Sequence, residues 1–189
     1  MSLTLRSAFV LVLATALFPG SRPPASADDD RLVALLPRSR HTIAQAVRQA
    51  EYPCPHEPVI SARFERNHDG KLSLSLASAE KGLSVAAEHN VLKELVASPE
   101  SERWTPAVEV FKEVEHVARA ATELTLAALS KFTLLEVLER AEKDEPGIVY
   151  AITPVVVERR ALWVVRVSTK AGVVSLRYDL LSGERIKNP

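Results

Sequence analysis

An internal repeat with a constant spacing of 91 residues constrains the fold of this chain more than any other feature of its sequence. Thr42-Ile-Ala-Gln45 and Thr133-Leu-Leu-Glu136 each match a capping box, in which Thr and Gln or Glu side chains bond to amides of a helix's first turn. An apolar stripe at helical spacing follows each box, formed by Ile43, Ala46, Val47 and Ala50 and by Leu134, Val137, Leu138 and Ala141. One ungapped spacing that serves both features indicates a duplicated module.

The same spacing relates strand patterns in the two copies. Alternating apolar residues occur at Leu72, Leu74 and Leu76 and at Leu83, Val85 and Ala87, and they map onto Trp163, Val165 and Val167 and onto Val174, Leu176 and Tyr178. In the first copy we predict a strand over Val59–Arg66 and a half-buried strand over Lys71–Ala77 with a serine face. In the second copy we predict strands over Ile148–Val157, Leu162–Thr169 and Val173–Asp179.

The residues between the copies predict a connecting helix. Thr105-Pro106 is a good cap followed by a good first helical residue, and an apolar stripe continues from there to Ala121. Val91–Val96 has the spacing of one or two helical turns. Leu32–Leu36 and Leu124–Leu129 occupy similar places before the two capping boxes, and either could be a strand that opens its module.

The second copy carries a recognisable combination of segments. It has a short helix with Ala141, a strand entering at Ile148, the hydrophobic Trp163-Val-Val-Arg-Val167, and the ending Asp179-Leu-Leu-Ser-Gly-Glu184. In these features it resembles the PepSY family, whose modules end in a similar Asp-x-x-Thr-Gly-Glu. The resemblance covers 133–186 well and 42–90 more loosely, because the first copy lacks the Ser-Gly-Glu turn.

This resemblance implies an α+β fold with two PepSY-like units, each a helix packed on a three- or four-stranded antiparallel sheet, joined by a long helix. The corresponding division is a signal peptide (1–27), a first unit (28–97), a connecting loop and helix (98–123) and a second unit (124–189). PepSY-like modules occur in propeptides of secreted peptidases, where an inhibitory or chaperone role is proposed. The family has no catalytic residues to carry over, and we assign no cofactor-binding residue in this chain. The closing motif also has a structural explanation, since Gly183 can supply positive φ and Asp179 can bond to turn amides.

The N-terminal segment has the composition of a signal peptide. Met1–Arg6 carries one positive charge, Ser7–Phe18 is a nearly unbroken apolar run, and Ala25-Ser26-Ala27 suits signal peptidase. Cleavage before Asp28 would place the protein outside the cytoplasm, in the periplasm or the medium. The alternative is an uncleaved N-terminal anchor. No later stretch is long and apolar enough to span a bilayer.

The balance of charge argues against nucleic-acid binding. The chain has 24 basic and 24 acidic residues, and loss of Arg6 and Arg22 with the signal would leave 22 against 24. Nucleic-acid-binding domains usually carry a basic surplus.

No catalytic, cofactor or metal motif emerges from the remaining residues. The histidines lie far apart in the sequence, at His41, His56, His68, His89 and His116. A structural zinc site requires four ligands, usually in spaced pairs, and Cys54-Pro-His56 has no second pair. Cys54 is the only cysteine, which excludes an internal disulfide. Asn67–Lys71 lacks the spaced acids of a calcium loop and predicts a hairpin turn.

One strand of the second copy is apolar on both faces. Leu162, Val164 and Arg166 lie opposite Trp163, Val165 and Val167, a pattern typical of a strand buried on both sides. The long helix 106–121 or the first copy could supply that cover. Alternatively, Leu162, Val164 and Arg166 form a strip that receives a protein partner, and they are our candidate partner-binding residues.

These observations favour an exported, non-enzymatic module that modulates or inhibits a protein partner, for which a secreted peptidase is the candidate. Surface occlusion with strand addition at a sheet edge would be the mechanism. The alternative is a sensor or carrier that binds a small ligand or a metal in the cleft between the two units. The sequence indicates neither the oligomeric state nor the identity of the partner.

Overall fold

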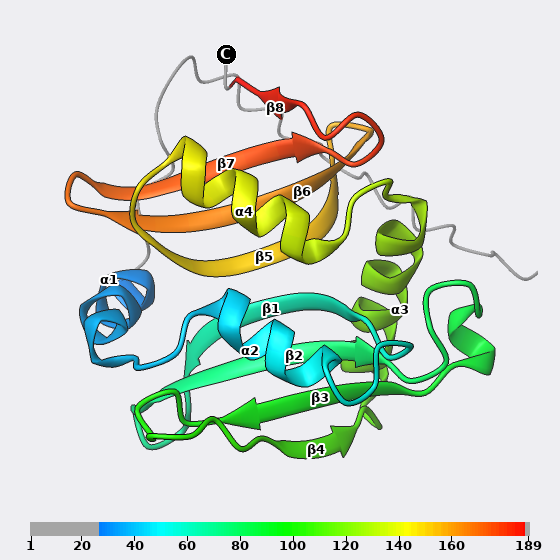
Figure 1. The fold of residues 1–189 in the computed structure, drawn as a ribbon, viewed down its shortest axis with the longest axis horizontal. Helices are drawn as coiled ribbons and strands as arrows, with labels where there is room; N and C mark the ends of the chain where they lie inside the picture. Colours follow the sequence, from blue (N-terminus) through cyan, green and yellow to red (C-terminus); the bar gives the residue numbers. More distant parts are fainter. Residues whose placement is uncertain (1–26, 188–189) are drawn as a thin grey trace, which may run out of the picture.

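The computed structural model describes residues 27–187 and shows one antiparallel sheet with helices on both faces (Figure 1). Its eight strands lie in the order β4-β3-β2-β1-β5-β6-β7-β8. The predicted α+β class is therefore confirmed. The predicted signal peptide lies outside the described residues, apart from Ala27 at the start of the first helix.

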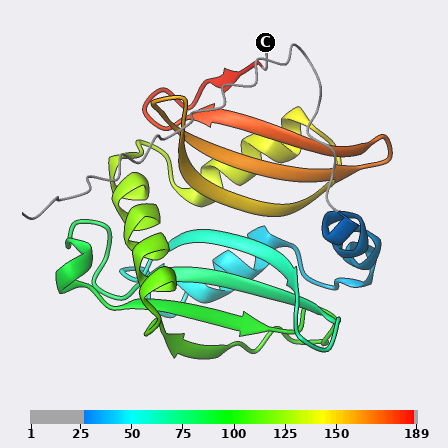
Figure 2. The ribbon, with the colours of Figure 1, turned by 180° about the vertical axis from the view of Figure 1, so that it is seen from behind.

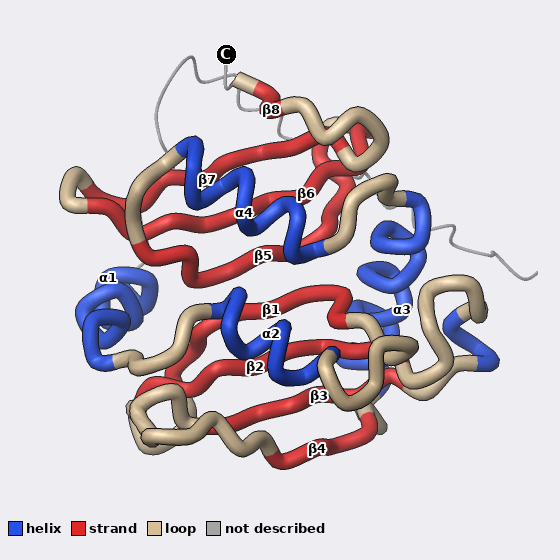
Figure 3. Tube along the Cα trace, in the orientation of Figure 1, coloured by secondary structure: helices blue, strands red, loops and turns tan. Residues whose placement is uncertain are grey.

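Figure 3 distinguishes the helices (blue) from the strands (red). The helices are α1 (Ala27–Leu35), α2 (Ile43–Glu51), α3 (Val114–Leu129) and α4 (Leu134–Asp144), with short 3-10 turns η1 (Leu36–Arg38) and η2 (Ala87–His89). The strands are β1 (Val59–Arg66), β2 (Leu72–Ala79), β3 (Leu92–Ala97), β4 (Ala107–Val110), β5 (Ile148–Val157), β6 (Arg160–Thr169), β7 (Gly172–Asp179) and β8 (Arg185–Ile186).

Both predicted capping boxes are present. The hydroxyl of Thr42 accepts the N–H of Gln45, and the hydroxyl of Thr133 accepts the N–H of Glu136, while each N3 side chain bonds back to the cap amide. The stripes behind these caps are buried, so α2 and α4 pack side by side on one face of the sheet (Figure 1). Helix α3 lies across β1, β3 and β5 on the opposite face (Figure 2).

The two halves of the sheet meet where β1 pairs with β5. This pairing is short and joins Ala62 with Ile152 and Arg63 with Ala151. On the helical face, Arg48 of α2 and Glu139 of α4 form an ion pair at 3.1 Å. These two residues are 91 positions apart, so equivalent positions of the repeat meet across the seam, as they do near a two-fold axis.

The alternation of Leu83, Val85 and Ala87 predicted a third strand in the first copy, and that prediction is wrong. Residues 83–86 form a loop and Ala87 begins η2, because Asn90 donates to the carbonyls of Gly82 and Val85 and holds this segment in place. The third strand is β3, where we expected helical turns. Ala97 of β3 pairs with Leu74 of β2, and in the second copy Leu176 of β7 pairs with Val165 of β6. Leu74 and Val165 are 91 residues apart, but Ala97 and Leu176 are only 79 apart. The connection that leads to the third strand is therefore twelve residues longer in the first copy.

The structure corrects three further expectations. The helix expected over 106–121 begins only at Val114, because residues 107–110 pair with the free edge of β3 as strand β4. Neither Leu32–Leu36 nor Leu124–Leu129 is a strand. The first ends α1 and enters a 3-10 turn, and the second is the end of α3.

Strand β2 is buried on both faces, not on one as predicted. Ser73 and Ser75 are 6% and 2% exposed, because α3 spans the flanking strands β1 and β3 on the serine face. Ser75 satisfies its hydroxyl by donating to the carboxylate of Glu94. The buried serines are therefore part of a polar layer beneath α3.

The closing motif has the structural role predicted for it. Gly183 adopts a φ of +68°, and the carboxylate of Asp179 accepts the N–H groups of Leu181 and Ser182 at 3.0 and 2.9 Å. A Cβ atom on Gly183 would lie 2.5 Å from both the ring of Phe132 and the guanidinium of Arg140. This turn therefore requires glycine for backbone conformation and for space.

We expect Gly183→Ala to lower the free energy of unfolding by at least about 1–3 kcal/mol, the usual cost of a strained backbone conformation, with an added cost for the contact with Phe132. Urea denaturation measures it. Gly70→Ala is the matched control, because Gly70 has a similar φ of +75° and its nearest neighbour is a flexible arginine end at 3.3 Å. An equal loss in both variants would contradict the steric part of this prediction.

Candidate functional site

Strand β4 is an open edge of the sheet. Within the part of the chain that the structure describes, it pairs only with β3, and all four of its residues are exposed. The N–H of Phe111 donates to the carbonyl of Leu92, which fixes the alternation of the ladder. The N–H and C=O groups of Glu109 therefore point toward β3, and those of Val108 and Val110 point away from the sheet. Such an edge is a template for pairing with another chain.

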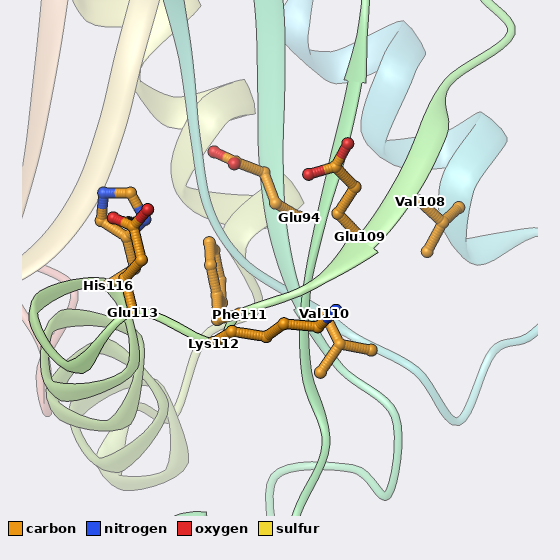
Figure 4. Close-up of a pocket in the computed structure, with 8 residues that line it drawn as sticks. All are labelled: Glu94, Val108, Glu109, Val110, Phe111, Lys112, Glu113 and His116. Atoms are coloured by element: carbon orange, nitrogen blue, oxygen red, sulfur yellow. Dashed lines mark ion pairs between the residues drawn. The ribbon is translucent and has the colours of Figure 1, made fainter.

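The two faces of this edge differ in chemistry. Val108 and Val110 are 57% and 48% exposed on one face. On the other face, Glu109 stands directly opposite Glu94 of β3. Figure 4 shows the carboxylates of Glu94 and Glu109 on one side of the strands and Val110 on the other.

A hollow of about 500 Å³ lies where this edge meets the start of α3. Its lining residues are Glu94, Val108, Glu109, Val110, Phe111, Lys112, Glu113 and His116 (Figure 4). Glu113 precedes α3 and lies 3.5 Å from Nδ1 of His116, whose ring meets Phe111 edge-on at 6.0 Å. Three carboxylates therefore converge on one side of an exposed strand.

Only part of this negative charge is compensated. Glu94 receives the hydroxyl of Ser75 and an arginine nitrogen of Arg63 at 3.4 Å. Glu109 makes no ion pair with any residue between 27 and 187 that the structure describes. Like charges directly opposite each other in a sheet are destabilising. The repulsion between Glu94 and Glu109 therefore leaves the carboxylate of Glu109 available to a cationic group on a bound molecule.

Beneath α3, Glu123 is a buried acid. It is 5% exposed, its Oε2 accepts the hydroxyl of Ser61 at 2.6 Å, and Nε of Arg119 is 4.0 Å from its Oε1. Burial raises the pKa of the Glu123 carboxyl above its ordinary value, and these partners only partly oppose that shift. Glu123 therefore joins the second half of α3 to β1.

A second, smaller cavity of about 190 Å³ lies at the junction of the two halves. Its lining comes from both of them and consists of Glu51, Pro55, Pro58, Val59, Leu83, Ala127, Phe132, Thr133, Leu134, Leu135 and Trp163. Glu51 supplies the one carboxylate, and its Oε1 accepts the N–H of Val59 at 3.0 Å. Burial raises the pKa of Glu51.

The candidate partner-binding residues lie on the face of β6 that points away from α4. Leu162 is buried at 3% exposure, while Val164 and Arg166 are half-buried. Arg166 is already engaged, because its guanidinium pairs with Asp29 of α1 at 3.2 Å and lies over the ring of Tyr150. Helix α1, which we did not predict, therefore supplies a contact on this face.

The structure does not bring Leu162, Val164 and Arg166 together with the β4 edge, which lies at the far end of the first half of the sheet. Sequence reasoning missed the β4 site because it extended the helix back to Pro106. The alternation Val-Glu-Val at 108–110 was the available signal. Among residues 27–187, no three His, Cys, Asp or Glu side chains are placed to hold a metal ion.

Comparison with known proteins adds little to this geometry. No family model matches the chain, so the likeness to PepSY modules rests on the residues quoted above. No curated protein matches it either. A crystal structure of a putative lipoprotein from Clostridium difficile 630 is similar over 79% of this chain and 92% of its own, at 13% identity and a TM-score of 0.40. That likeness is too distant to support an argument.

We expect Glu123→Gln to remove a pH dependence of stability. A carboxyl whose pKa is raised by folding stabilises the native state below its unfolded pKa, and this contribution is lost as pH rises through the folded pKa. The free energy of unfolding of the wild type relative to Glu123→Gln should therefore fall as pH rises above the ordinary pKa of a glutamate, 4.5. Denaturation at several pH values measures it, with Glu115→Gln on the exposed side of α3 as the control for net charge. A difference that rises with pH would contradict the assignment.

Proposed function

We propose that this protein is an exported, non-enzymatic binding module of two PepSY-like units that binds a protein partner and modulates or inhibits it. A secreted peptidase is the candidate partner. The units span 28–97 and 124–189 and are joined through 98–123. Support for two units comes from the paired capping boxes and from the meeting of equivalent residues Arg48 and Glu139 at the seam.

The observation that carries this proposal is the open edge at β4. Its outward backbone groups and exposed valines suit addition of an extended segment of the partner, a recognised mode of peptide binding. The rest of the partner would then be held against this end of the molecule and occluded. Leu162, Val164 and Arg166 remain our proposed second contact on the face of β6, although Leu162 itself is buried.

We expect Val108→Pro to abolish capture and inhibition of the partner. Proline at 108 removes an N–H that points outward, so the β3–β4 ladder keeps its own bonds while the added strand loses one. The assay compares capture of extracytoplasmic peptidases by the tagged wild type and variant, followed by inhibition of each captured enzyme. Val108→Thr is the matched control because it keeps the N–H. If Val108→Pro inhibits the partner as well as the wild type does, the proposal that the partner binds at the β4 edge is wrong.

The proposed export has a test of its own. No helix among the described residues has the length and apolar character to cross a membrane. We expect N-terminal sequencing of the full chain, expressed in the source cells and recovered from the extracytoplasmic fraction, to begin at Asp28. Recovery of an uncleaved chain from the cytoplasm would contradict export.

The cavity at the junction favours one alternative, a sensor or carrier for a small ligand. Glu51 and the surrounding apolar side chains suit a small amine with an apolar body rather than an anion. Ligand that binds only the folded state raises the melting temperature. The alternative predicts such a rise in a screen of small amines and its loss in Glu51→Gln, which keeps the acceptor for Val59 but removes the charge.

A further inference from the structure

We propose that β4 accepts an extended segment in which apolar and basic residues alternate. This inference rests on the proposed function and adds the chemistry of the segment that the partner offers. It follows from the different character of the two faces of the edge. Each face selects one half of the alternating side chains of an added strand.

An added strand places its side chains in step with those of β4. Successive side chains of a strand point to opposite faces, and residues directly opposite each other on neighbouring strands share a face. Residues of the segment opposite Val108 and Val110 would therefore lie on the valine face. The residues between them would lie on the face of Glu109.

The valine face favours apolar side chains. Val108 and Val110 are about half exposed, and Val108 stands opposite Leu95 of β3, which packs against the core. Apolar residues on the segment would remove this surface from water. Lys112, which follows the strand, lies on the side of Val110 in Figure 4 and would disfavour a basic residue on this face.

The opposite face favours a basic side chain. Glu109 has no cationic partner among the described residues, it faces Glu94 directly, and Glu113 lies in the same hollow. A Lys or Arg beside Glu109 would place a positive charge against an acidic pair that the sheet itself leaves unbalanced. An acidic side chain at the same place would add a third like charge to the pair.

A second copy of the protein fits this edge less well. Antiparallel pairing of two β4 strands would bring both copies of Glu109 to one face, beside both copies of Glu94. The charges of the edge are therefore complementary to a basic segment and not to β4 itself.

Synthetic peptides of one length test the inference against the purified, exported protein. Val-Lys-Val-Lys-Val is the basic probe, Val-Glu-Val-Glu-Val the acidic probe and Val-Thr-Val-Thr-Val the neutral probe, each acetylated and amidated. We expect the basic probe to bind at least about tenfold more tightly than the acidic one, since an attractive cross-strand pair replaces a repulsive one. Calorimetry gives the affinities, and amide shifts at residues 107–113 in NMR spectra give the location.

Charge reversal supplies the matched variant. Glu109→Lys should invert the preference between the basic and acidic probes, and Glu109→Gln should reduce it without inversion. Glu115→Lys on the exposed side of α3 makes the same change in net charge and should leave the preference as in the wild type. All variants alter exposed side chains, and their melting temperatures confirm that they fold.

The outcomes separate this inference from the proposed function. The inference that the added segment is basic is wrong if the basic and acidic probes bind equally, or if Glu109→Lys keeps the wild-type preference. Either result leaves the proposal of strand addition intact. Failure of every probe to bind, with a dimer in sedimentation that Val108→Pro disrupts, would identify a second copy as the occupant and overturn the inference. If Val108→Pro leaves capture of the partner unchanged, the proposal that the partner binds at the β4 edge is wrong.

Discussion

The pairing of β1 with β5 is the constraint on which the rest of the structure depends. It joins two four-stranded halves into one sheet through only two residue pairs, Ala62 with Ile152 and Arg63 with Ala151. Such a short ladder is reinforced by burial, because α2 and α4 pack beside each other on one face and α3 crosses β1 and β5 on the other. The joined halves turn β1 and β5 into central strands and leave β4 and β8 as the edges of the sheet.

The two edge strands of the sheet differ in length, and this difference places the candidate site at β4 rather than at β8. Strand β8 consists of two residues after the Asp179–Glu184 turn, so it offers little backbone for pairing. Strand β4 presents four exposed residues with two valines on one face and a glutamate on the other. Natural proteins usually blunt or cover an edge of this kind, so an open one is a reasonable place to expect a partner.

The polar layer under α3 links the fold to that site. Ser61 of β1 donates to Glu123 of α3, which joins the sheet to the helix, while Ser75 and Arg63 bond to Glu94 within the sheet. Glu113 and His116, at the start of α3, line the same hollow as Glu94 and Glu109. Glu94 belongs both to this layer and to the acidic pair with Glu109, so its charge is only partly neutralised from within.

The sequence by itself determined the elements whose signals are local. The capping boxes at Thr42 and Thr133, the helices behind them, β1, β2 and strands β5 to β7 follow from side-chain periodicity and hydrogen-bonding groups a few residues apart, whereas the two-residue β8 was not predicted. Only the tertiary structure decided the roles of 83–97 and 107–113. Leu83–Ala87 alternates like a strand, but Asn90 ties it into a loop, and 107–110 leaves its helical pattern because the free edge of β3 satisfies its backbone. The acidic pair could not be predicted from the sequence either, because Glu94 and Glu109 become neighbours only when β3 and β4 pair in this register.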